Sequence, residues 1–190
     1  MAMVCTHIAA AAAAMSWTLL EARLNHSKPN SVGTVTGMVA GLAAVTPASG
    51  YIGPEGALVL GIISGMVCEQ MAKFIKDIML IDDSLDVFAV HGVGGIIGSI
   101  GVAALGHPYF QGLGLTDSIG YHLKVQSLAV ATVCTWSFFA TWMILKILDR
   151  ITHIRASDED EKEGLDVVDH GEMAYGLNPW KIENSSALSS

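Results

Sequence analysis

Residues 87–116 read VFAVHGVGGIIGSIGVAALGHPYFQGLGLT and contain no aspartate, glutamate, lysine or arginine. A helix needs about 20 apolar residues to cross the hydrocarbon core of a bilayer, so this run is long enough to span a membrane. Similar apolar runs lie on both sides of it. We predict membrane spans near residues 2–21, 31–48, 56–75, 86–105 and 121–148, the third of which contains Glu69.

The composition of the whole chain favours the same interpretation. Hydrophobic residues make up 52% and charged residues 15% of its 190 residues, and its mean hydropathy is +0.49. A soluble globular chain carries about 25% charged residues, and so many long apolar runs leave too little polar sequence to cover them in water. We therefore predict an all-α fold, a polytopic membrane helix bundle with about five transmembrane helices.

The charges divide the chain into two parts. Residues 1–155 hold 9 acidic and 8 basic side chains, net −1, whereas residues 156–190 hold 9 acidic and 2 basic, net −7. We predict a transmembrane domain over 1–155 and a cytoplasmic regulatory tail over 156–190, disordered at its end. The acidic run 157–163 is expected to be a solvated linker. A nucleic-acid partner is excluded because no basic surface exists.

Lysine and arginine predict the orientation, because they are enriched in cytoplasmic connections. The connections on one side hold Lys124 alone. Those on the other side hold Arg23, Lys28, Lys73, Lys76, Lys146, Arg150 and Arg155. The C-terminus is therefore expected in the cytoplasm and the N-terminus of this chain outside. Because Met1 lies almost at the membrane, we expect the chain to be the C-terminal part of a longer protein.

The spacing of glycines predicts where the spans pack closely, and a segment with proline and glycine predicts where one span ends. Small residues four apart let helix backbones approach closely in lipid, and this spacing occurs at Gly33/Gly37/Gly41, Gly61/Gly65 and Gly94/Gly98. Residues 46–54, TPASGYIGP, break the second span. Such a backbone persists at membrane depth only where protein or a cavity covers it. An ordinary outer loop is the alternative.

His91 is the candidate for chemistry. Ionisable side chains inside membrane spans are rare and usually face a cavity or the bundle interior. An imidazole there can pass hydrogen bonds, shuttle a proton or ligate a metal; the alternative is a histidine that is merely hydrogen-bonded in the bundle. Val87 lies four residues earlier and shares its helix face. An aspartate or serine in the run before it, 82–86, can cap the helix.

Three motifs, in order, resemble the ammonium transporter family. They are TPASGYIGP at 46–54, DDSLDVFAVHGVGG at 82–95 and GLDVVDHGEMAY at 164–175, and the second resembles the Amt branch rather than the Rhesus branch. The resemblance implies an eleven-span fold of two pseudo-symmetric five-span halves and a final long helix. It also implies a homotrimer with one pore in each subunit. This chain would hold the seventh to eleventh spans.

The resemblance also implies roles for individual residues. His91 is similar to the second member of the family's central histidine pair, Val39 and Val87 to its apolar pore-lining positions, and Thr46 to a threonine beneath the outer ammonium-recruiting site. Asp86 resembles the acidic residue at the start of the histidine-bearing helix. Further structural or gating positions, including those in the segment that couples neighbouring subunits, are Asp83, Gly92, Gly164, Asp166, His170 and Gly171.

The implied function is transport of ammonium or ammonia through a hydrophobic, histidine-lined pore in the plasma membrane, without a cofactor and without enzymatic activity. Ammonium is recruited outside, loses its proton and passes the histidines. A PII-class signal protein is an implied partner on the cytoplasmic face. Two alternatives are a non-conducting ammonium sensor made from a truncated transporter and a haem-bearing membrane subunit of an oxidoreductase. The haem would need a partner for His91, and His7 and His122 lie toward the other side.

Overall fold

In the computed structural model, the described residues are 1–24, 30–112, 117–152 and 154–172. Over these ranges every regular element is a helix, which confirms the all-α prediction. The chain divides into two compact units, Met1–Trp136 and Ser137–Ser190. The predicted connection that contains Lys28 and the chain end from residue 173 lie outside the described residues.

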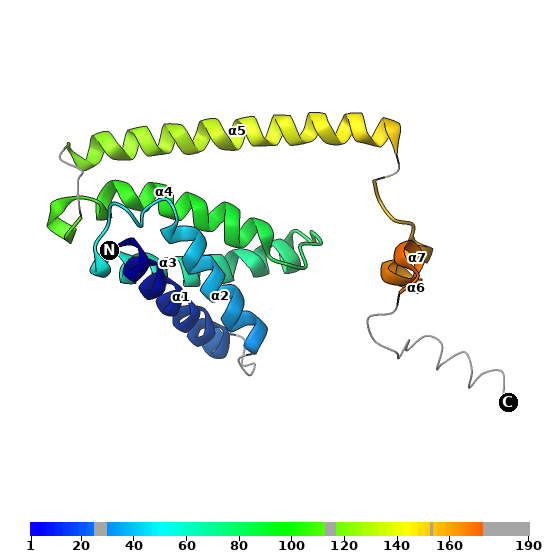
Figure 1. Cartoon of the computed structure of the whole chain (residues 1–190), viewed down its shortest axis with the longest axis horizontal. Helices are drawn as coiled ribbons and strands as arrows, with labels where there is room; N and C mark the ends of the chain where they lie inside the picture. The colour runs from blue at the N-terminus through cyan, green and yellow to red at the C-terminus, as the bar shows by residue number, and fades with distance from the viewer. Residues whose placement is uncertain (25–29, 113–116, 153, 173–190) are drawn as a thin grey trace. The chain divides into compact units, whose positions relative to one another are not determined.

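Four helices form the bundle of the first unit. They are α1 (Ala2–Leu24), α2 (Ser31–Val45), α3 (Pro54–Lys73) and α4 (Gly94–Leu105), and α1 packs on both α2 and α3 (Figure 1). Two π-helical segments adjoin them. Helix α3 continues into η1 (Phe74–Ile78), and η2 (Phe88–Val93) leads directly into α4. A short 3-10 helix, η3 (Pro108–Phe110), follows α4.

The predicted spans correspond to helices. Ala2–Arg23, Pro54–Ile78, Phe88–Leu105 and Ile119–Ile151 are long and apolar enough to cross a bilayer. The second predicted span is shorter than expected, because α2 ends at Val45 after 15 residues, about 22 Å. A turn takes over there, in which Ala48 and Ile52 are fully buried. Protein therefore covers part of the Pro- and Gly-rich segment, whereas Thr46, Gly50 and Tyr51 are exposed.

The glycine repeats mark close helix contacts, as predicted. A Cβ on Gly41 or Gly61 would collide with the backbone of Ala9, so α2 and α3 both approach α1 at that point. A Cβ on Gly98 would collide with the Ala44 carbonyl, so α4 lies equally close to α2. Small residues thus set the separations in this bundle, because a larger side chain at these positions has no room.

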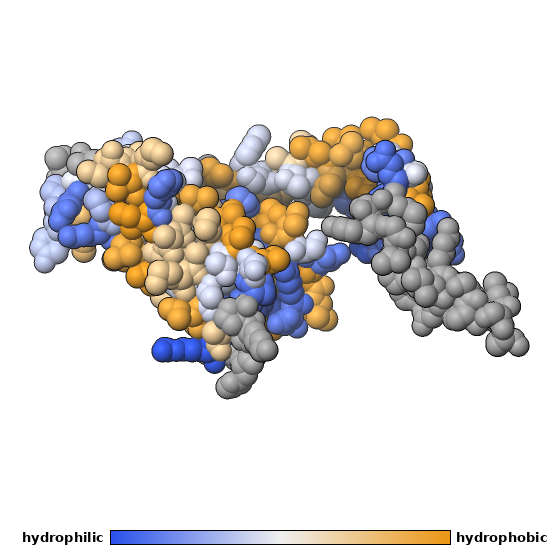
Figure 2. Space-filling model, turned by 60° about the horizontal axis from the view of Figure 1, so that its bottom comes forward, coloured by the Kyte–Doolittle hydropathy of each residue, from blue (hydrophilic) through white to orange (hydrophobic). Residues whose placement is uncertain are grey.

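The core of the bundle is narrow and its surface is apolar. One buried cluster includes Cys5, Ile52 and Leu60, and another surrounds Trp17 at the opposite end of α1. Many large hydrophobic side chains remain exposed, and Figure 2 shows them as orange areas over the surface. Exposed apolar area of this extent is unusual on a soluble monomer, and it fits a chain whose solvent is lipid.

The last long helix, α5 (Ile119–Ile151), extends across the boundary between the two units and buries none of its residues. Its 33 residues correspond to about 50 Å, more than the hydrocarbon core of about 30 Å requires. The helices α6 (Asp158–Glu163) and α7 (Leu165–His170) follow in the second unit.

The run at 157–163, which we expected to be a solvated linker, is helical from Asp158 onward. The Ser157 hydroxyl accepts a hydrogen bond from the Asp160 backbone N–H at 3.1 Å and caps α6. All the residues of the first turn are acidic, and negative charge near a helix N-terminus is favourable. The segment is nevertheless largely exposed, as a solvated run should be.

Candidate functional site

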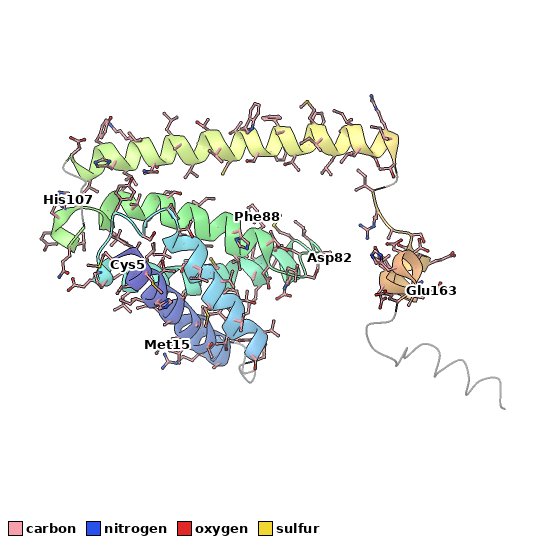
Figure 3. The ribbon with its side chains drawn as sticks, viewed as in Figure 1. Cys5, Met15, Asp82, Phe88, His107 and Glu163 are labelled. Carbon is pink, nitrogen blue, oxygen red and sulfur yellow. The ribbon has the colours of Figure 1, made fainter. Side chains whose placement is uncertain are left out.

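His91 lies in η2, a π-helical segment fixed at its start by an aspartate. The Asp83 carboxylate accepts hydrogen bonds from the backbone N–H groups of Val87 and Phe88, at 2.9 and 3.0 Å. These N–H groups would otherwise lack partners at a helix start. Figure 3 shows Phe88 at the beginning of this helical run, next to the loop that carries Asp82 and at the opposite end from His107. π-Helical turns are rare and often occur at functional sites.

Asp86, the last acidic residue of the loop, makes a different interaction. Asp86 has a positive φ of 56°, and its Oδ1 lies 2.7 Å from the Lys76 Nζ of η1. The ion pair ties the start of the His91-bearing helix to the end of α3. Both aspartates therefore hold η2 in place. Asp83 accepts hydrogen bonds from backbone N–H groups at its start, and Asp86 forms an ion pair with Lys76 of η1.

His91 lies level with the middle of α2. A Cβ on Gly94 would touch Ala40 and Ala43 of α2, and Gly98 approaches Ala44 one turn later. The two helices therefore run in the same direction, and His91, one turn before Gly94, lies near the segment that contains Val39. The side chains of His91 and Val87 are exposed and that of Val39 is half-buried.

The glycine after His91 has little room for a side chain. A Cβ on Gly92 would lie 3.1 Å from the nearest atom of the Phe88 ring, which is tighter than ordinary contact. The ring of Phe88 is itself 60% exposed. The glycine therefore allows an aromatic side chain to lie against the backbone of η2, one turn from the imidazole.

Among the predicted path residues, Thr46 lies at a different level of the bundle from His91. It lies at the C-terminal end of α2, seven positions after Val39, or about 10 Å along the helix axis. Its hydroxyl donates to the Leu42 carbonyl at 2.7 Å, and its side chain is exposed. Thr46 and His91 therefore lie at different levels of the bundle.

The predicted tail positions form a local motif in the second unit. Gly164 and Gly171 have φ angles of 104° and 65°, which favour glycine, and they flank α7. Within the turn that ends α7, the Gly171 N–H donates to Val167 and the Glu172 N–H to Asp166. His170 is exposed in the last turn.

Sequence reasoning missed a buried charge. Glu69 is 1% exposed in α3 and pairs with Lys73 one turn later. Its Oε2 has no hydrogen-bond partner within the described ranges. A buried carboxylate in a membrane protein needs a nearby cation, and the Glu-to-Lys spacing of four residues is the signal that could have identified the pair.

The arrangement can exchange hydrogen bonds with a small molecule. His91 carries no hydrogen bond or ion pair to any part of the chain that the structure describes, so both ring nitrogens are available. A neutral imidazole offers one donor and one acceptor. Apolar side chains surround it, including Val87 and Phe88, which are both more than half exposed. Among the described residues no cluster of three or more metal-ligating side chains occurs.

Comparison with protein families gives one match. The model of the Ammonium Transporter Family matches residues 1–175. Amt1 of Archaeoglobus fulgidus is 38% identical over 175 residues, which cover 92% of this chain and 44% of that protein. The ammonium transporter of Bacillus subtilis is 37% identical over 174 residues, covering 90% of this chain and 43% of that protein.

Solved structures show the same likeness. A "Sensor Amt Protein" superposes with a TM-score of 0.79 at 30% identity, over 89% of this chain and 41% of that one. Candida albicans Mep2 superposes with a TM-score of 0.74 at 32% identity, over 84% of this chain and 37% of that one. The chain therefore spans less than half the length of the curated relatives it matches.

Proposed function

Because this chain belongs to the ammonium transporter family and is an integral membrane protein, we propose that it forms one wall of a path by which ammonium or ammonia crosses the membrane. The observation that carries the proposal is the exposed His91, which projects from a capped π-helical segment among exposed apolar side chains. An imidazole in such surroundings can accept a proton or pass it on, while the apolar side chains disfavour hydrated ions.

The site has three parts with different tasks. His91 exchanges hydrogen bonds and a proton with the substrate. Val39 and Val87 provide apolar surface next to it, which lets a small neutral molecule pass once the charge of the cation has been given up. Desolvation of an ammonium ion is costly, so the path favours ammonia with the proton carried separately. Thr46 marks the level at which ammonium enters.

The opposite side of the path comes from outside this chain. The curated relatives are more than twice as long as the region they share with it, and a site built at the interface of two repeats needs residues from both. The exposure of Val87 and His91 agrees with a surface that another segment covers. We therefore infer a homotrimeric transporter in which each subunit contains both walls, and the α7 motif contacts a neighbouring subunit or a PII-class protein.

The test replaces His91 in the transporter that contains this chain, reconstituted on a solid-supported membrane. His91→Ala should reduce the ammonium-induced current at least ten-fold, because the proton relay is lost, while the apolar surface remains. His7→Ala is the matched control, since His7 is an exposed histidine of α1 to which the proposal gives no role, and its current should equal that of the parent. A wild-type current for His91→Ala would refute the assignment.

A second substitution tests the apolar surface. Val87→Asp places a carboxylate one turn from His91, where it would bind the cation tightly and slow its release. The current should fall at least ten-fold, whereas Val87→Leu, which keeps the surface apolar, should retain most of it. Equal currents for both variants would show that Val87 lies away from the path.

A further inference from the structure

One aromatic side chain lies open beside His91. Phe88 is the first residue of η2, whose other apolar side chains are alanine and valine. It is 60% exposed and precedes the histidine by three positions, a spacing that makes two side chains neighbours on a helix surface. Figure 3 shows it at the end of the η2–α4 run that adjoins Asp82. A molecule that moves from His91 toward the acidic loop therefore passes the level of this ring.

The backbone of η2 holds the Phe88 ring in place and leaves much of it free. The Phe88 N–H donates to the Asp83 carboxylate at 3.0 Å, which fixes the start of the segment. One edge of the ring lies against Gly92, because a Cβ there would come within 3.1 Å of Cδ2 and 3.3 Å of Cε2. The glycine makes this position of the ring possible. The rest of the ring surface remains accessible to a ligand.

The charges at this end of the bundle favour a cation. The loop before η2 carries three carboxylates, those of Asp82, Asp83 and Asp86. Asp86 pairs with Lys76 at 2.7 Å, whereas Asp82 is exposed and makes no ion pair with the described residues. The Asp83 carboxylate accepts only neutral backbone N–H groups. An excess of negative charge beside the path attracts small cations to it.

We propose that the Phe88 ring is a cation-binding position on the acidic-loop side of His91, which holds an ammonium ion before the ion is released. The position depends on the proposed function, because it lies on the same path. The face of an aromatic ring is negative and attracts a cation placed over it. Leucine would offer apolar surface without this attraction. The ligand class is a small nitrogen cation, such as ammonium or methylammonium, and the predicted orientation assigns the position to the cytoplasmic end.

Ring fluorination tests the position, because fluorine withdraws electron density from the ring face and changes the size of the ring little. Phenylalanine with one, two or three ring fluorines replaces Phe88 in the transporter that contains this chain. Ammonium-induced currents are recorded on a solid-supported membrane from inside-out vesicles, which present the cytoplasmic end. The half-saturating ammonium concentration should rise with each fluorine, by about three- to ten-fold in total. In right-side-out vesicles it should equal that of the parent.

Phe74 is the matched control for fluorination. It begins η1 as Phe88 begins η2, and it is 44% exposed. Its fluorination should change neither concentration. Gly92→Ala should raise the half-saturating concentration in inside-out vesicles, because the new Cβ displaces the Phe88 ring. Gly95→Ala should leave it unchanged, since a Cβ at Gly95 would meet nothing within 4 Å.

The outcomes separate this position from the transport path as a whole. A half-saturating concentration that does not depend on the fluorination of Phe88 would overturn the proposal. An equal rise in vesicles of both orientations, or an equal rise on fluorination of Phe74, would overturn it as well. A parent transporter without any ammonium-induced current would instead contradict the proposed function, and the cation position would fall with it.

Discussion

At the scale of single residues, Asp83 stabilises the segment that carries His91. Both of its carboxylate oxygens accept backbone N–H groups, at 2.9 and 3.0 Å. Asp83→Ala should therefore lower the free energy of unfolding by about 0.5–2 kcal/mol, the range measured for lost helix caps. Chemical unfolding in detergent measures it. Asp82→Ala is the control, because Asp82 is exposed and its side chain makes no hydrogen bond to the described residues; equal losses in both variants would contradict the capping role.

The sequence identified this acidic loop as a candidate helix start. It did not show which aspartate caps the helix and which one forms an ion pair. Asp83 and Asp86 are the same residue type three positions apart, and either could cap a helix. The difference lies in the backbone, since Asp86 has a positive φ and reaches Lys76 across the loop. His91 was identified because an ionisable group in an uncharged run stands out. Glu69 was not recognised as paired, because its burial depends on α1 packing against α3.

At the scale of helices, the contact between α2 and α4 depends on one glycine. A Cβ on Gly98 would overlap the Ala44 backbone, whereas a Cβ on Gly95 would meet nothing within 4 Å. Gly98→Ala should therefore destabilise the bundle by about 1–3 kcal/mol, as overpacking does. Gly95→Ala should be neutral or stabilising by up to about 1 kcal/mol, because alanine favours the helix. Unfolding in detergent compares the two. Similar losses for both would mean that the close approach of Gly98 to Ala44 does not determine the cost.

The positions of the helices were predictable, but their internal geometry was not. Long apolar runs identify spans because a bilayer imposes a length, and α1 and α3 follow their predicted ranges closely. The π-helical segments could not be predicted from the sequence, since a change to i→i+5 backbone hydrogen bonds does not change which residues are apolar. The early end of α2 at Val45 follows from Pro47, yet the burial of Ala48 and Ile52 depends on neighbouring helices.

At the scale of the whole molecule, the chain alone should not transport ammonium. It presents Val87 and His91 on an exposed face, and one repeat supplies only one side of a site formed between two. Expressed alone in a transporter-deficient cell on low ammonium, it should give no growth above the empty vector. A full-length relative is the positive control. Growth rescued by this chain alone would show that it forms a complete path.

The orientation is also a property of the whole chain, and the seven-to-one distribution of basic residues predicts that the tail lies in the cytoplasm. Ser186→Cys in a Cys134→Ser background should resist a membrane-impermeant thiol reagent in intact cells and react after lysis. Labelling of intact cells would reverse the topology. Neither the proposed trimer nor the second side of the path follows from the composition and spacing of these residues, because both rest on the resemblance to the family.

The π-helical turn at Phe88–Val93 restricts which mutations the gene can tolerate. A π turn holds one residue more than the α turn it replaces, so an in-frame deletion of one codon there would restore an α-helix. That deletion would leave the residues before the turn nearly in register with α4, because the π turn already accommodates the extra residue. A one-codon deletion within the regular helix α4 would instead rotate everything before it by about 100° relative to the rest of that helix, and His91 and Val87 would turn away from the face they present. The gene should therefore tolerate the loss of a codon between Phe88 and Val93 better than the loss of one inside α4.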